Sequence, residues 1–384
     1  MALAIQPPIV RQRGGSQPRV LELDGLRAFA ILPVILLHCR PLDGHWRVLS
    51  AIGEHGGIGV SLFFVLSGYL ITGILLDSVR SPHYYRNFVV RRAIRIFPLY
   101  YATLTILILC PGLFATSAVW VDMRTWGLGW FFVYAGNLRQ AWMAQWPPVV
   151  SFSPLWSLQV EEQFYLLFPL IVSLLSRRNL ARFLIVSAIV APVLRCALVY
   201  SSPSNWMAAA VLTPCRMDAL ALGGLVALLV RAEVVYCRPE YVPRLQYASA
   251  ALAGLAACGS LFVKQDGSVS ATPFSSAAAQ SCVNVAFAAF LCWVVFSPTS
   301  RLVTLFRSRP LAYIGQISYG LYLLHIPASW VVRAGIRQIF GSEVPAHSRL
   351  AVPVTYGAAL IAAGLSWRFF ESPLLQLKDR FVSR

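Results

Sequence analysis

Residues 23–39 read LDGLRAFAILPVILLHC, and this stretch decides the fold class, because a run this long and apolar suits a lipid bilayer. Arg27 lies near one end of it and His38 near the other. On a helix the two side chains share one face, about 16 Å apart along the axis. Ionisable groups inside a membrane span are costly and usually face a protein interior, so this pair predicts a functional site.

The composition of the whole chain also indicates a membrane protein. Of its 384 residues, 58% are hydrophobic and 12% are charged, which is unlike a soluble domain of this length. We therefore expect an all-α, polytopic membrane protein embedded in the lipid bilayer. The formal charge of +17 is explained by arginines in the loops between spans. No basic patch with exposed aromatic residues is present, so nucleic acid is not an expected partner.

Apolar runs predict about ten transmembrane spans. They lie near residues 22–40, 57–76, 94–112, 160–176, 182–201, 215–231, 246–263, 278–297, 313–331 and 351–370. Lys and Arg gather in the loops on the side of the two termini, which predicts that both termini are cytoplasmic. The aromatic segment 113–159 is expected to be re-entrant or interfacial, because its apolar runs are short and interrupted by Gly and Pro.

The remaining segments predict no further domain. We expect a cytoplasmic tail at 1–19, one transmembrane domain at 20–373 and a cytoplasmic tail at 374–384. The N-terminus lacks the apolar core and cleavage site of a signal peptide, so the first span is expected to act as the anchor. The eight cysteines form no CxxC pair and mostly fall in apolar stretches. Buried thiols are therefore expected, and no metal site.

A cluster of arginines stands where the third span is expected to begin. The segment is NFVVRRAIRIFPLYY at residues 87–101, with Arg91, Arg92 and Arg95 on overlapping faces of a helix. Positive charge that flanks a span on the cytoplasmic side explains the cluster without a ligand. The alternative is a phosphate clamp, because guanidinium groups match phosphate oxygens.

Two adjacent carboxylates precede the fourth span. The segment is SFSPLWSLQVEEQFYLLFP at residues 151–169, and it contains Glu161 and Glu162. Neighbours on a helix point about 100° apart, so at most one is expected to face a common cavity. The pair is either solvated at the level of the headgroups, or one carboxylate orients a histidine or accepts a proton.

A second histidine is expected at the depth of His38. The segment ISYGLYLLHIP at residues 317–327 ends near His325, about 18 Å into its span. Each histidine alone is explained by a hydrogen bond inside the bundle. A neutral imidazole in a dry pocket can also take a proton from a hydroxyl, which makes His38 a candidate general base. Arg216 and Asp218 in CRMDALALGG, residues 215–224, are interpreted as part of an intramembrane ion-pair network.

Taken together in chain order, these segments resemble acyltransferase family 3, a family of integral-membrane acyltransferases. They are DGLRAFAILPVILLH, GVSLFFVLSGYLI, NFVVRRAIRIFPLYY, LWSLQVEEQFYLLFP, RMDALALG, ISYGLYLLHIP and FFESP, spread over about residues 20–373. Each segment alone is weakly specific, whereas the ordered set is specific.

The resemblance implies an enzyme of the bacterial inner (cytoplasmic) membrane that moves an acyl group, often acetyl, from acyl-CoA to a hydroxyl of a glycan or a glycosylated small molecule. It places Arg27 and His38 as the catalytic pair, Arg92 and Arg95 in an Arg-x-x-Arg element, and Glu161 or Glu162 as the carboxylate of the WSL motif. Some relatives carry a fused SGNH hydrolase-like domain, which is not expected in this chain. The competing hypotheses are a transporter or flippase for a lipid-linked glycan and a non-catalytic scaffold. Oligomeric state and acceptor are left open.

Overall fold

The computed structural model describes residues 20–39, 46–114, 117–232, 241–262, 273–341, 344 and 348–381. These parts of the chain are helical and contain no strand, which confirms the all-α class. The helices are α1 Leu21–Leu37, α2 Arg47–Glu54, α3 Ile58–Ser78, α4 Tyr84–Leu109, α5 Ser117–Trp126, α6 Gly129–Phe132, α7 Gly136–Met143, α8 Leu155–Leu174, α9 Arg177–Ser201, α10 Trp206–Val211, α11 Thr213–Val230, α13 Tyr241–Phe262, α14 Pro273–Phe296, α15 Arg301–Phe306, α16 Arg309–Gln316, α17 Ser318–Phe340, α18 Ala351–Ser366 and α19 Ser372–Phe381.

Five helices in the described chain are long and apolar enough to cross a bilayer. They are α3, α4, α9, α11 and the part of α14 from Ala278 to Phe296. Each coincides with a predicted span. The other predicted spans coincide with helices α1, α8, α13, α17 and α18. That these also cross the membrane, and that both termini are cytoplasmic, stay predictions, and residues 1–19 lie outside the described part.

Three predicted segments differ in extent from the helices that contain them. The helix of the third predicted span begins at Tyr84 rather than near residue 94, because its polar first turns contain no helix breaker and continue the helix. The predicted span 313–331 is divided at Ile317 between α16 and α17. Next to this break, Gly315 lies so close to α1 that a Cβ would be 1.8 Å from the backbone oxygen of Asp24. Residues 372–381, mostly assigned to a tail, form α19, which packs against α4.

The described residues of the segment 113–159 form short helices and turns up to Pro154, and residues 155–159 are the beginning of α8. α5 has 10 residues, α6 has 4 and α7 has 8. A helix needs about 20 residues to cross the hydrocarbon core, so none of these spans it alone. Their aromatic side chains instead pack on the end of the bundle, where Trp126 stacks on Phe131 with ring centroids 5.5 Å apart.

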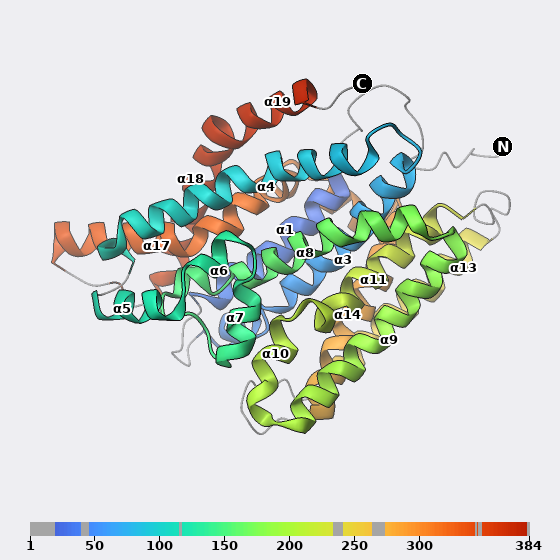
Figure 1. The fold of residues 1–384 in the computed structure, drawn as a ribbon, viewed down its shortest axis with the longest axis horizontal. Helices are drawn as coiled ribbons and strands as arrows, with labels where there is room; N and C mark the ends of the chain where they lie inside the picture. Colours follow the sequence, from blue (N-terminus) through green and yellow to red (C-terminus); the bar gives the residue numbers. More distant parts are fainter. Residues whose placement is uncertain are drawn as a thin grey trace.

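α3 is the central helix of the bundle, in contact with α1, α8, α11 and α14. In Figure 1, α9 and α13 lie on one side of this centre and α17, α18 and α19 on the other. Glycines permit the close approach of α3 and α11. A Cβ at Gly68 would lie 2.0 Å from the backbone oxygen of Leu220, and one at Gly223 would lie 2.0 Å from that of Val65. Small residues at such crossings let helix backbones pack in contact.

The outer surface of the bundle is apolar, as expected beside lipid. α9 shows this most clearly, because only 17% of its most apolar window is buried. Ile185, Val186, Ile189 and Val190 are all about half exposed or more. A contiguous apolar face of this size on a soluble protein would favour aggregation. We therefore treat this chain as a membrane protein whose surface is solvated by acyl chains.

The cysteines in the described part of the chain are free thiols. Cys39, Cys215 and Cys292 are buried, as expected for small hydrophobic residues. Cys110 and Cys258 are exposed, contrary to the expectation of burial. Cys110 follows the last residue of α4, and Cys258 lies on α13. Cys237 lies outside the described residues.

Candidate active site

A cavity of about 110 Å³ lies between α1, α3, α4, α8 and α17. Five of the residues singled out from the sequence line it, namely Arg27, Arg92, Arg95, Glu161 and Glu162. The rest of the wall is mostly apolar or hydroxyl-bearing: Val60, Phe63, Phe64, Leu66, Ser67, Leu70, Ile71, Ile96, Ser157, Leu158, Tyr165, Ser318, Tyr319 and Tyr322. Segments from across the sequence therefore meet at one charged cavity inside an apolar bundle.

The cations of the cavity come from two helices. Arg27 of α1 donates through Nη1 to Asp24 Oδ1, 2.9 Å away, one turn earlier on the helix. Arg92 of α4 lies over the rings of Phe88 and Tyr165, with its Cζ 5.7 Å from each ring centroid. These contacts hold the guanidinium groups in place and leave further N–H donors to meet a ligand.

The arginine cluster of α4 is divided between two faces. Arg92 and Arg95 line the cavity, and Arg95 does so with an exposed side chain. Arg91 is exposed and does not line the cavity. Arg95 is one turn from both Arg91 and Arg92, so helix periodicity does not separate the three, and the packing of the neighbouring helices decides which of them line the cavity. The three arginines therefore do not form one phosphate clamp in the cavity, because Arg91 does not line it.

Both carboxylates line the cavity, so the expectation that at most one would do so was wrong. The physical reason is that α3, α4 and α17 leave a wide arc of α8 facing the cavity, wide enough for two positions 100° apart. Glu161 lies beside the hydroxyls of Ser67 and Tyr165, whose oxygens are 2.7 Å apart. Glu162 is 5% exposed, and its Oε1 has no hydrogen-bond partner among the described residues. An orphaned buried oxygen of this kind requires a proton, a water or a ligand.

The two histidines meet away from the cavity lining. His38 follows the last residue of α1, and His325 lies on α17, where it is completely buried. Nδ1 of His38 is 3.2 Å from Nε2 of His325, and the ring centroids are 4.9 Å apart. The two residues are 287 positions apart in the chain. The expectation that they reach one layer is confirmed, while their chemical role stays a prediction.

The hydrogen bonds fix the tautomers of this pair. Nδ1 of His325 is 2.8 Å from the backbone oxygen of Tyr322, and a carbonyl can only accept, so this nitrogen carries the proton. Nε2 of neutral His325 is then an acceptor. Nδ1–H of His38 donates to it and to the oxygen of Val34, 3.0 Å away. Nε2 is consequently the basic nitrogen of His38.

Tyr322 connects the cavity to the histidine pair. Its side chain lines the cavity, and its ring centroid is 6.2 Å from that of His325. Its hydroxyl is 2.6 Å from Oγ of Ser157 and donates to the oxygen of Pro154, 2.7 Å away. The sequence analysis missed Tyr322, Ser157, Ser67 and Tyr165. All four lie in the quoted motif segments, but nothing in their spacing separates them from ordinary helix-packing residues.

One further carboxylate lies near the arginines, just beyond the last predicted span. Glu371, in the π-helix Trp367–Glu371, accepts a hydrogen bond from Ser366 Oγ at 2.9 Å. Burial raises the pKa of its carboxyl, and Ser366 and the charge of Arg95 oppose that rise. Glu371 is thus the carboxyl that the FFESP segment contributes. Its charge depends on the packing of α4 against the end of α18, because that packing sets both its burial and its distance from Arg95.

This chain is similar to a known protein family over most of its length. A family model described as "Acyltransferase domain" matches residues 20–368. "Putative peptidoglycan O-acetyltransferase YrhL" of Bacillus subtilis (strain 168) is 30% identical over an alignment of 382 positions that covers 94% of this chain and 56% of that protein. "O-acetyltransferase OatA" of Staphylococcus aureus (strain NCTC 8325 / PS 47) is 27% identical over an alignment of 381 positions that covers 93% of this chain and 57% of the relative.

A third similar protein is "Peptidoglycan O-acetyltransferase OatA" of Listeria monocytogenes serovar 1/2a, at 28% identity over an alignment of 412 positions, gaps included, that covers 96% of this chain and 57% of the relative. The chain thus spans little more than half the length of the curated relatives it matches. No solved structure matches this chain. None of these three relatives is named as a transporter, so the flippase hypothesis gains no support from them.

Proposed function

This chain belongs to the acyltransferase family whose domain model covers residues 20–368, and we propose that it moves an acetyl group from acyl-CoA to a hydroxyl of a cell-envelope glycan. The three relatives described above are named as O-acetyltransferases, two of them as acting on peptidoglycan. Peptidoglycan is accordingly the acceptor class that we propose. The proposed location is the bacterial inner membrane, with the chain crossing it several times.

One observation carries this proposal, namely the cavity that collects Arg27, Arg92, Arg95, Glu161 and Glu162 inside an apolar bundle. A volume of about 110 Å³ is smaller than the roughly 150 Å³ cavity that takes a benzene ring. Such a space suits part of the narrow pantetheine arm of acetyl-CoA and not its nucleotide. The arginines supply donors for the carbonyl, phosphate and amide oxygens of the donor substrate.

In the proposed mechanism, His38 acts as the general base. The acceptor hydroxyl attacks the thioester carbonyl while its proton passes to Nε2 of His38. The tetrahedral intermediate then collapses, the carbon–sulfur bond breaks, and the thiolate of coenzyme A takes the proton from the imidazolium. His325 accepts the Nδ1–H of His38 at 3.2 Å and so stabilises the charged ring. The donor arm has to reach past Tyr322, which stands between the cavity and the histidines.

The cavity charges have separate proposed roles. Arg27 lies about 16 Å along the helix from His38 and binds the amides of the pantetheine arm. Arg92 and Arg95 bind the phosphates or the arm of the donor. One of Glu161 and Glu162 orients the reactants, and Glu162 is the better placed because its Oε1 has no partner among the described residues. A cavity that excludes water strengthens each of these contacts and holds the two reactants together.

The proposed function is tested with purified protein in detergent or nanodiscs, acetyl-CoA and chitotriose or a muramic acid-containing oligosaccharide. We expect thiol release that depends on the acceptor, with an equal amount of ester on the sugar. A transporter would move a glycan without consuming the thioester. Thiol release that is absent with every oligosaccharide and lipid-linked acceptor would contradict the proposal.

Arg92→Gln is expected to raise the KM for acetyl-CoA about 30-fold, since one charge-assisted hydrogen bond contributes about 2 kcal/mol. The matched control is its neighbour, Arg91→Gln, which removes the same charge from the same turn of α4 but outside the cavity. Its KM should stay within about twofold of the unmodified protein, as expected for an exposed charge. Equal effects of the two substitutions on initial-rate kinetics would show that net charge matters and the cavity does not.

A further inference from the structure

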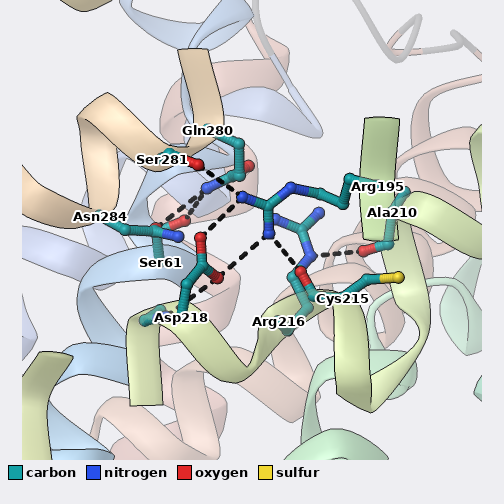
Figure 2. Close-up of polar contacts among 10 residues, drawn as sticks. Ser61, Arg195, Ala210, Cys215, Arg216, Asp218, Gln280, Ser281 and Asn284 are labelled. Carbon is teal, nitrogen blue, oxygen red and sulfur yellow. Dashed lines mark hydrogen bonds and ion pairs between the residues drawn. The ribbon is translucent and has the colours of Figure 1, made fainter. Parts of the chain in front are cut away.

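A second polar cluster lies inside the bundle, separate from the cavity (Figure 2). Its centre is an ion pair between Arg195 of α9 and Asp218 of α11, with Nη2 2.7 Å from Oδ2 and Nη1 3.1 Å from Oδ1. Arg195 also donates to Ser281 Oγ of α14 at 2.8 Å and to the backbone oxygen of Cys215. The ion-pair network predicted for Asp218 is therefore present, and its partner comes from α9.

The charges in this cluster do not balance. Asp218 is held by both terminal nitrogens of Arg195, and the two groups are 1% and 4% exposed. Arg216, two residues before Asp218, adds a second guanidinium that acts on the same carboxylate. Its Nε donates to the oxygen of Ala210 at 2.6 Å, and its Cζ lies 5.2 Å from the ring centroid of Trp156. An excess cation inside an apolar bundle is costly and marks a site that binds an anion.

Two buried hydrogen-bond donors of the cluster also have no acceptor among the described residues. They are Nε of Arg195 and Nδ2 of Asn284, whose side chain is completely buried. Asn284 Oδ1 accepts from Gln280 at 3.1 Å, and Gln280 also donates to Ser61 at 2.7 Å. The cluster thus shows unused donors and an unbalanced positive charge. A negative charge beside Arg216 would balance the excess.

The cluster lies next to the catalytic cavity. The guanidinium group of Arg216 lies over the ring of Trp156, and on α8 Trp156 directly precedes Ser157, a residue of the cavity wall. Its ring is in edge contact with Phe64, another residue of the wall, with centroids 5.9 Å apart. Trp156 thus contacts Arg216 on one side and the cavity wall on another. Arg216 is therefore a near neighbour of the cavity without lining it.

We propose that Arg216, supported by Trp156, binds an anionic group of the acceptor, a carboxylate or a phosphate, while the hydroxyl to be acylated reaches His38. This inference rests on the proposed function and adds that the acceptor is acidic. The donor does not explain the site, because Arg27, Arg92 and Arg95 already supply cations to the donor on the other side of Trp156. A carboxylate would come from an acidic sugar, and a phosphate from a lipid-linked saccharide.

The test compares three acceptors of equal sugar length with the full chain and acetyl-CoA. They are neutral chitotriose, an oligosaccharide whose muramic acid carries a carboxylate, and a polyprenyl-diphosphate-linked oligosaccharide. Arg216→Gln should raise the KM for the carboxylate or the diphosphate acceptor about 10-fold or more, the loss of one charged contact. The KM for chitotriose and for acetyl-CoA should change by less than about twofold. Arg182→Gln, an exposed arginine of α9, is the matched control.

The acceptor whose KM rises in the Arg216→Gln variant shows whether the bound anionic group is a carboxylate or a phosphate. Retained transfer to chitotriose shows that the variant is folded. If Arg216→Gln does not fold, the unmodified protein gives the answer. Its KM for the acidic acceptor should then rise with sodium chloride while that for chitotriose stays constant, because salt screens ion pairs. Equal changes for all three acceptors, or none, would overturn this inference alone. Failure of the unmodified protein to acetylate any acceptor would instead overturn the proposed function.

Discussion

His38→Ala is expected to lower the turnover number for acetyl transfer about 1,000-fold, within the usual range for loss of a general base. The hydrogen-bond geometry makes Nε2 the basic nitrogen of this ring, and alanine leaves no group there to take the hydroxyl proton. The KM for acetyl-CoA should change little, because Arg27, Arg92 and Arg95 are untouched in the cavity. A fall in turnover with an unchanged KM is the signature of a group that acts in the transition state.

The matched control for this substitution is His55→Ala. His55 is an exposed histidine just after α2, and its Nδ1 is 2.9 Å from the backbone oxygen of Ala51, four residues earlier. Nδ1 of His38 makes the same kind of contact with the backbone oxygen of Val34. It should retain full turnover and the same melting temperature. Turnover is measured as acceptor-dependent thiol release, and folding by size-exclusion profile and thermal melting. A folded His38→Ala variant that keeps a tenth or more of the activity would rule out the base.

The relative turnover of two variants of His325 is expected to show whether this residue positions His38 or only fills space in the bundle. His325→Gln keeps an acceptor oxygen within reach of Nδ1–H of His38, whereas His325→Leu keeps the volume and removes the acceptor. If His325 fixes the tautomer of His38, turnover should fall about 100-fold in the leucine variant, from loss of about 3 kcal/mol of charged hydrogen bonding. The glutamine variant should keep a tenth or more of the turnover.

Packing alone predicts the opposite order. The site of His325 is completely buried, and leucine is the better residue for an apolar interior, while an amide there needs partners. Melting temperatures of both variants, measured beside turnover, separate the two effects. A leucine variant that is stable and slow supports the tautomer role. A glutamine variant that is slower than the leucine variant would contradict it.

Several features of the active site could be predicted from sequence because they depend on local periodicity. Arg27 and His38 stand eleven positions apart in one apolar run, and that spacing fixes their relative face and depth on any helix. The same reasoning identified His325 at matching depth in another span. It also placed Arg92 and Arg95 on one helix, and the helical regularity that supports these predictions holds whatever the neighbouring helices are.

The sequence by itself thus determined the helical membrane class, the positions of most helices and the residue types that carry the chemistry. Tertiary structure alone decided which faces meet: that Glu161 and Glu162 both line the cavity, that Arg91 does not, and that Asp218 pairs with Arg195. The physical reason is that helix periodicity is local, whereas the pairing of helix faces depends on close contacts such as those at Gly68 and Gly223. Such contacts join residues far apart in the chain, and no short-range pattern encodes them.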